Sequence, residues 1–203
     1  MPKLDLKKEW KHLYQPSAKA VTAVEVPALN YLMVDGRGDP NTAQAYVEAV
    51  EALYAVAYAL KFKVKNGKAG IDYAVMPLEG LWWAEDMRQF SVKDKDAWQW
   101  TMMIVQPEYV TAKLFAETLG EVQKKKRLPA LARLRFESYH EGRAAQIMHL
   151  GPYADEEPTI TKLHDFIHAR GGERQGKHHE IYLKDPRKSA PGKLLTVIRQ
   201  PFR

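Results

Sequence analysis

The sequence contains no cysteine among its 203 residues, which excludes disulfide bridges, thiolate nucleophiles and cysteine-ligated metal sites. It also contains no run of about 18 apolar residues that would predict a membrane-spanning helix. The opening "MPKLDLKKEW" lacks the apolar centre of a signal peptide. Because hydrophobic residues (45%) and charged residues (28%) are as frequent as in ordinary folded domains, we expect a globular protein of the cytoplasm without a membrane partner.

Several motifs for common chemistries are absent as well. The sequence has no GxxxxGK[ST], GxGxxG or GxSxG, so phosphate-cradling loops and a serine-hydrolase elbow are unsupported. His164 and His168 are four residues apart, but no third ligand accompanies them. The net charge of +6 is spread along the chain without a basic stripe or a DNA-reading motif. We therefore predict no metal, no cofactor and no specific nucleic-acid partner.

The sequence does contain an internal repetition of one pattern: a strand, a glycine turn, a helix and two further strands. One copy reads "ALNYLMVDGRGDPNTAQAYVEAVEALYAVAYAL", "IDYAVMP" and "AWQWTMMIVQP". The other reads "AAQIMHLGPYADEEPTITKLHDFIHARGG", "HHEIYLKDP" and "KLLTVIRQP". Gly36 and Gly151 end the first strands, and Pro40 and Pro158 stand near the predicted helix starts.

These copies define the predicted domain organisation. Residues 1–20 are an N-terminal extension and residues 21–203 a single domain, with repeat one at about 21–107 and repeat two at about 131–203. A linker helix is predicted at about 108–127. Repeat one carries about 21 extra residues, mostly between its second and third strands, and this insertion contains Trp82 and Trp83. The fold class is α+β, with two pseudo-symmetric repeats, mainly antiparallel sheets, helices on one face and a ligand cleft between the halves.

The predicted strand "KHHEIYLKD" offers a first chemical candidate, Glu180. Alternation places Glu180 on one face with His178 and Tyr182. The other face carries Ile181 and Leu183, which fit a core against a helix. Two interpretations stay open: a solvated strand glutamate, or a carboxylate that balances a cationic ligand or acts as an acid or base.

Aromatic residues cluster in the strands and insertion of repeat one. Tyr73, Trp82, Trp83, Trp98 and Trp100 supply five large rings, which either belong to the core or form a cage for a flat or cationic ligand. Glu79, in "PLEGLWW", is a second candidate carboxylate, with a polar loop residue as the alternative.

The paired halves, together with "IMHLGPYADEEPTITKLHDFI", "HHEIYLKDPRKSAPGKLLTVIRQP" and "DYAVMPLEGLWW", resemble the GyrI-like small-molecule-binding proteins, in the branch without a DNA-binding domain. The resemblance extends from about residue 20 to the end of the chain. It implies a ligand-contacting glutamate at Glu180, and the tryptophan-rich insertion is similar to that of the cyclopropanoid cyclopropyl hydrolase subfamily. Candidate catalytic residues are thus Glu180 and Glu79, and candidate ligand-binding residues are Tyr73, Trp82, Trp83, Trp98, Trp100, Tyr153 and Tyr182.

The function that this resemblance implies is binding of hydrophobic planar or cationic xenobiotics, with hydrolysis of cyclopropane-bearing DNA-alkylating compounds and protection of the cell. The alternatives are a sensor or scavenger without catalysis, and a protein that modulates gyrase by contact. The sequence names neither a natural ligand nor a partner protein.

Overall fold

A computed structural model of the chain describes residues 3–68, 70–85 and 95–203. The chain divides into two compact units, and neither is a continuous stretch of sequence. Unit 1 comprises Met1–Leu6, Leu29–Met76 and Trp82–Tyr139, and unit 2 comprises Lys7–Ala28, Pro77–Leu81 and His140–Arg203. Part of the insertion predicted in repeat one, residues 86–94, lies outside the described residues.

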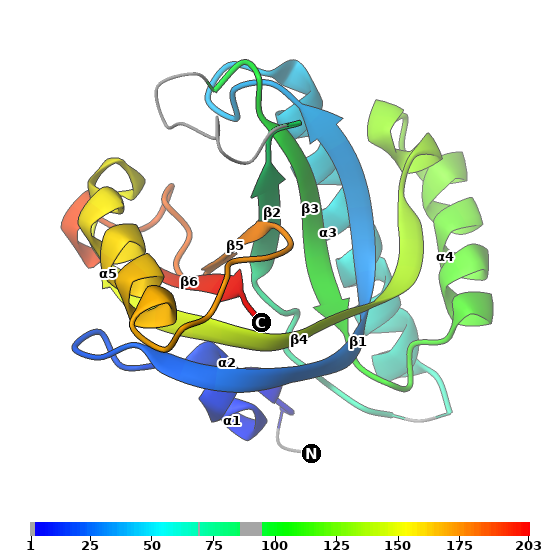
Figure 1. Ribbon diagram of the computed structural model, residues 1–203. Helices are drawn as coiled ribbons and strands as arrows, with labels where there is room; N and C mark the ends of the chain where they lie inside the picture. Colours follow the sequence, from blue (N-terminus) through cyan, green and yellow to red (C-terminus); the bar gives the residue numbers. More distant parts are fainter. Residues whose placement is uncertain (1–2, 69, 86–94) are drawn as a thin grey trace. The chain divides into compact units, whose positions relative to one another are not determined.

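Unit 1 is built on two long antiparallel strands. Strand β1 (Thr22–Arg37), of which the part from Leu29 belongs to unit 1, pairs with β3 (Gln99–Gln106), in a register that joins Asn30 to Gln106 and Arg37 to Gln99. Helix α3 (Gln44–Asn66) packs against β3, against helix α4 (Ala112–Lys125) and against the short η1 (Pro129–Ala132) (Figure 1). The side of α3 that faces this core consists of Ala49, Ala52, Leu53, Val56, Ala57, Leu60 and Val64. Their spacing of three and four residues explains why the segment forms a helix with a buried stripe.

Unit 2 is an antiparallel sheet covered by one helix. Strand β6 (Leu195–Pro201) pairs with β5 (His178–Tyr182) and with β4 (Arg135–Leu150), which belongs to unit 2 from His140. Helix α5 (Glu157–His168) packs on β6. Its Leu163 and Ile167 share a core cluster with Ala145, Ile147 and Ile198 from the strands. The helix ends before Gly171, which adopts a φ of +66°, a conformation that favours glycine.

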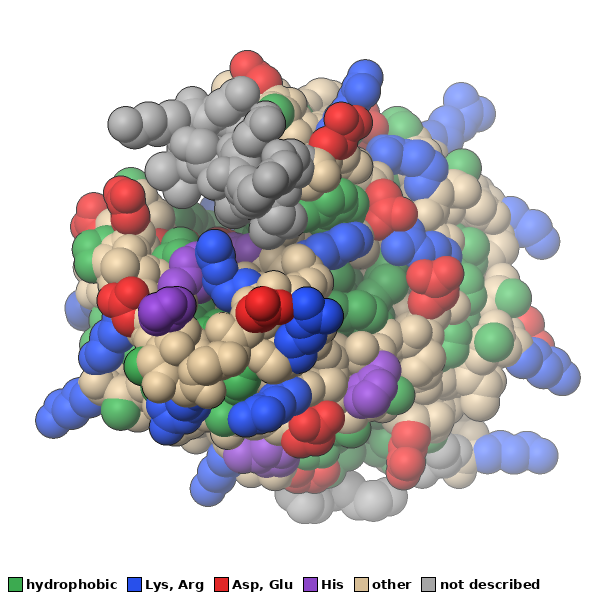
Figure 2. Space-filling view, viewed as in Figure 1, with side chains coloured by type: hydrophobic (Ala, Val, Ile, Leu, Met, Phe, Trp, Pro, Cys, Tyr) green, Lys and Arg blue, Asp and Glu red, His purple; other side chains and the backbone are tan. Residues whose placement is uncertain are grey.

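The remaining elements are short. Helices α1 (Leu6–Glu9) and α2 (Lys11–Tyr14) precede β1, and η2 (Tyr153–Asp155) and η3 (Pro191–Lys193) lie in loops of unit 2. Strand β2 covers Leu78–Trp83. Among the described residues, no helix combines the length and the apolar character that a bilayer crossing requires. On the face shown in Figure 2, basic side chains are interspersed with acidic ones.

The antiparallel α+β prediction is confirmed, whereas two local predictions are wrong. The sequence predicts a strand over 71–77, but there Tyr73 forms an isolated parallel bridge with Leu4, and the strand β2 begins after Pro77. Proline lacks the N–H that a sheet ladder uses, which fits its place at this boundary. Pro158 does stand in the first turn of α5, but Pro40 lies before a turn in which Asp39 accepts hydrogen bonds, and α3 begins only at Gln44.

Candidate functional site

A histidine between two carboxylates forms the most buried polar cluster of unit 2. His179 Nε2 lies 3.0 Å from Oε2 of Glu79, and His179 Nδ1 lies 2.9 Å from Oε1 of Glu141. The side chains of His179 and Glu79 are 0% exposed. The sequence left open that Glu79 is a polar residue of a loop. The structure instead places it on strand β2 with its side chain buried in unit 2.

Two further side chains complete this cluster. Tyr14 donates its hydroxyl hydrogen to Oε1 of Glu79 at 2.9 Å. Arg199 donates from Nη1 to Glu141 at 3.0 Å and from Nη2 to the Leu13 carbonyl at 2.8 Å. Two carboxylates thus face one guanidinium and one imidazole, so that the cluster is electrically balanced when His179 is protonated.

The electrostatics of the cluster favour that protonated state. Burial alone lowers the pKa of His179, but the charge of Glu141 and the hydrogen bonds to Glu141 and Glu79 outweigh it and raise the pKa to about 9. Burial likewise raises the pKa of Glu141, but His179 and Arg199 outweigh it and lower that pKa to about 2. At neutral pH both ring nitrogens of His179 therefore donate hydrogen bonds.

Glu180 lies on the other face of β5 and retains contact with solvent. Its Oε1 is 3.0 Å from His178 Nε2, and its Oε2 accepts a hydrogen bond from the Tyr182 hydroxyl at 2.7 Å. The three residues share a face, as the alternation of the strand predicts. The Glu180 side chain is 14% exposed. It is therefore mostly buried, unlike the solvated strand glutamate that the sequence left open, but water can still reach it.

The surroundings of Glu180 keep it ionised. Burial raises the pKa of Glu180. The hydrogen bond and the charge of His178 lower this pKa, as do the hydrogen bonds of Tyr182 and Glu156, and together they outweigh burial, so that the pKa is lowered. The ring of Tyr153, whose residue is 38% exposed, packs edge to face on Tyr182 with centroids 5.5 Å apart. An ionised carboxylate beside a pair of rings can hold a cation or orient a water molecule.

Unit 1 contains an aromatic cluster of four rings, those of Tyr46, Trp82, Trp98 and Trp100. Trp82 packs edge to face on Trp98 at 5.4 Å, and Tyr46 contacts Trp82 at 6.2 Å and Trp100 at 5.5 Å. Three of these rings are among the predicted ligand-binding residues. Tyr46 is the fourth, and its helical spacing in the sequence predicts a core residue of α3 and not a ligand contact.

The other predicted aromatic residues have different surroundings. Tyr73 is buried and packs on Tyr109 at 5.5 Å, and burial, followed by the neighbouring Tyr109, raises its pKa. Trp83, at the end of β2, is half-buried. Trp100 is completely buried, and its indole N–H donates to the Gly38 carbonyl at 3.3 Å. Trp83 and Trp98 are thus the tryptophans of this set that reach the surface.

No group of three or more metal-ligating side chains suited to an ion occurs in the described part of the chain. His164 instead lies 3.1 Å from Arg174 Nη1, and burial followed by the charge of Arg174 lowers its pKa to about 4.

Comparison with known proteins identifies the family. A model of the GyrI-like small molecule binding domain matches residues 19–203. The chain belongs to the GyrI-like family. The resemblance expected from the sequence is thereby confirmed, and the domain binds small molecules as a family property.

Three solved structures from Listeria innocua are similar to this GyrI-like chain over nearly its whole length. One is an uncharacterised conserved protein, 39% identical, with a TM-score of 0.92 over 99% of this chain and 100% of that one. Two are described as hydrolases, 36% and 38% identical, with TM-scores of 0.86 and 0.88 over 99% and 100% of this chain and all of theirs. No curated protein matches the chain.

Proposed function

We propose that this GyrI-like protein binds hydrophobic planar or cationic xenobiotics and hydrolyses cyclopropane-bearing DNA-alkylating compounds, which protects the cell. The observation that carries the proposal is the environment of Glu180, an ionised carboxylate that keeps 14% of its side-chain surface exposed beside Tyr182. Two relatives at 36% and 38% identity that are described as hydrolases support the catalytic part.

The proposed chemistry needs little beyond a placed water and a carboxylate. Glu180 takes a proton from water while the water oxygen bonds to the cyclopropane methylene. The carbon–carbon bond of the ring breaks, and its electron pair passes through the conjugated system to the carbonyl oxygen, giving a phenolate. That oxygen then takes up a proton, so that the product is the substrate plus one water. The Tyr182 hydroxyl, 2.7 Å from Glu180, is the nearest phenolic donor for this step.

Aromatic contacts hold the ligand in this proposal. Tyr153 and Tyr182 lie next to Glu180, and a flat ligand can stack on their rings. Ligand contact by Trp83 and Trp98, which are half-buried in unit 1, stays a prediction from the sequence.

Mass spectrometry tests the proposal directly. Incubation with a cyclopropane-bearing alkylator should give a product heavier by one water, in amounts that exceed the protein. Glu180→Gln should lower the turnover by about 100-fold or more, because loss of a general base has effects of that order. The same substitution at the exposed Glu25 is the matched control.

Two results would contradict the proposal. Turnover by Glu180→Gln equal to that of the wild type would exclude the carboxylate as the base. Tight stoichiometric binding without gain of water would instead support the alternative function of a scavenger that only sequesters the compound.

A further inference from the structure

Helix α3 has a stripe of exposed residues that faces away from its core, and three of its six residues are apolar or aromatic. The residues in question are exposed and follow one another at intervals of three, four or seven along the helix: Gln44, Val47, Glu51, Tyr58, Phe62 and Lys65. These intervals place all of them on one face. Val47, Tyr58 and Phe62 are 56%, 48% and 51% exposed. A helix on the surface of a monomer normally presents a polar outer face, so this stripe is unusual.

Aromatic side chains form the centre of this outer stripe. Tyr54 is half-buried, and its ring lies 6.2 Å from that of Tyr58. Phe62 follows Tyr58 by four residues, so that three rings stand in one row along the helix. Tyrosine and phenylalanine are enriched at the centres of protein interfaces, where they bury a large area.

The charges of the stripe are arranged symmetrically about its middle. Glu51 precedes Tyr58 by seven residues, and Lys65 follows it by seven. If two copies of the helix lie antiparallel about a two-fold axis at Tyr58, Glu51 of each copy faces Lys65 of the other. The same axis brings Tyr58 against its own copy and Tyr54 opposite Phe62. Such a self-complementary patch is what a two-fold dimer requires.

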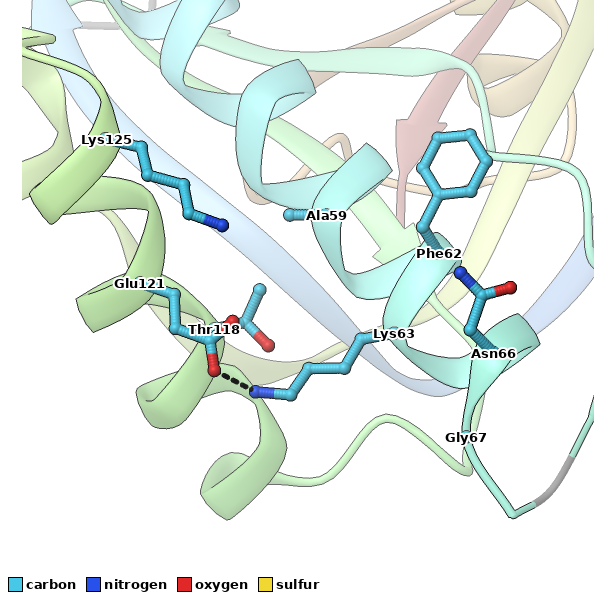
Figure 3. Close-up of a pocket in the computed structure, with 8 residues that line it drawn as sticks. All are labelled: Ala59, Phe62, Lys63, Asn66, Gly67, Thr118, Glu121 and Lys125. Atoms are coloured by element: carbon cyan, nitrogen blue, oxygen red, sulfur yellow. Dashed lines mark hydrogen bonds and ion pairs between the residues drawn. The ribbon is translucent and has the colours of Figure 1, made fainter.

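A hollow of about 460 Å³ adjoins the stripe on the side of α4 (Figure 3). Phe62 and Asn66 line it from α3, and Thr118 and Lys125 line it from α4. The Lys63 ammonium reaches across to Glu121 at 2.7 Å and joins the two helices at this point. Phe62 thus lies at the edge of an open depression between α3 and α4.

We propose that the protein forms a two-fold homodimer through antiparallel packing of its α3 helices, with Tyr54, Tyr58 and Phe62 at the centre and Glu51 opposite Lys65 at both ends. A single pair of helices covers less than the roughly 800 Å² per partner of standard interfaces. The dimer is therefore weak, with a dissociation constant on the order of micromolar. It is independent of the proposed hydrolysis.

Charge reversal with rescue tests this register. Sedimentation velocity over about 1 to 300 μM protein should show the wild type passing from monomer to dimer. Glu51→Lys places lysine opposite lysine twice, and Lys65→Glu places glutamate opposite glutamate twice. Each should weaken the dimer by about tenfold. The double variant restores two opposite-charge pairs and should dimerise again.

Controls separate dimerisation from stability. Lys65 also forms an ion pair with Asp72 at 2.8 Å, which both Lys65→Glu and the double variant lose. Rescue in the double variant therefore cannot arise from that pair. Glu25→Lys makes the same reversal at another exposed glutamate and should leave the dimer unchanged. A wild type that stays monomeric at 300 μM would overturn the proposal. The proposal would also be overturned if the double variant dimerised as weakly as the two single effects added together predict.

Discussion

Gly36 illustrates how one missing side chain fixes the position of a tryptophan. A Cβ atom at this position would lie 2.1 Å from Cη2 of Trp100 and 2.3 Å from Cζ2. The indole thus occupies the space that any other residue at position 36 would need, and the antiparallel pairing of Gly36 with Trp100 brings the two together.

We predict that Gly36→Ala destabilises the protein by about 1–3 kcal/mol or more, because the completely buried indole has little room to move. Urea denaturation followed by tryptophan fluorescence measures the change. Gly120→Ala is the matched control: Gly120 lies in α4 with no atom within 4 Å of the added Cβ, so alanine should stabilise that helix by up to about 1 kcal/mol. Equal effects of the two substitutions would contradict the packing explanation.

At the residue scale, the sequence predicts some of the candidate site and misses the rest for a physical reason. Strand alternation suffices to place Glu180 beside Tyr182, since both lie on one face of one strand. The partners of Glu79 are out of reach of such local rules. Tyr14 and His179 are 65 and 100 positions away along the chain, and only the tertiary fold brings them to the carboxylate.

At the scale of elements, helix α4 depends on a side chain just before its first residue. The Thr111 hydroxyl oxygen accepts a hydrogen bond from the Leu114 N–H at 3.2 Å, which satisfies one of the amides that a helix start leaves unpaired.

Thr111→Ala should lower the free energy of unfolding by about 1 kcal/mol. Thr111→Ser should retain most of the stabilisation by this cap, because serine keeps the accepting oxygen. Thermal unfolding followed by circular dichroism compares the two variants with the wild type. If serine is as damaging as alanine, the hydrogen bond is not the source of the effect.

Element types were easier to predict than their boundaries. The helical spacing of apolar residues identifies α3, α4 and α5, and α3 and α5 each bury an apolar stripe. The sequence predicts a strand at "IDYAVMP" because this segment is as apolar as a strand, but Tyr73 in it makes only an isolated bridge with Leu4, and β2 begins at Leu78. Apolar composition cannot tell such a segment from a strand, since both are buried.

At the scale of the whole molecule, the buried cluster around His179 makes stability depend on pH. The pKa of His179 is raised from 6.5 to about 9 in the folded protein, so its contribution is complete below pH 6.5 and is lost as pH rises through about 9. The pKa of Glu141 is lowered from 4.5 to about 2, so its contribution is complete above pH 4.5 and is lost as pH falls toward 2.

We therefore expect the free energy of unfolding to fall between about pH 6.5 and 9, and His179→Gln to lower stability and to flatten that decline. Urea denaturation at intervals from neutral to alkaline pH measures both effects. His12→Gln, at an exposed histidine, should keep the wild-type slope. An unchanged alkaline slope in His179→Gln would show that another group is responsible.

The division of the chain into two interleaved units has a consequence for its synthesis. Unit 1 takes its last residue from position 139, so every segment it needs has been translated before the ribosome adds the His140–Arg203 segment of unit 2. Unit 2 uses Lys7–Ala28 and Pro77–Leu81, but the strands that receive them come from His140–Arg203. The earliest-made part of unit 2 must consequently wait for the last-made part, and Glu79 meets His179 only after 100 further residues have been translated.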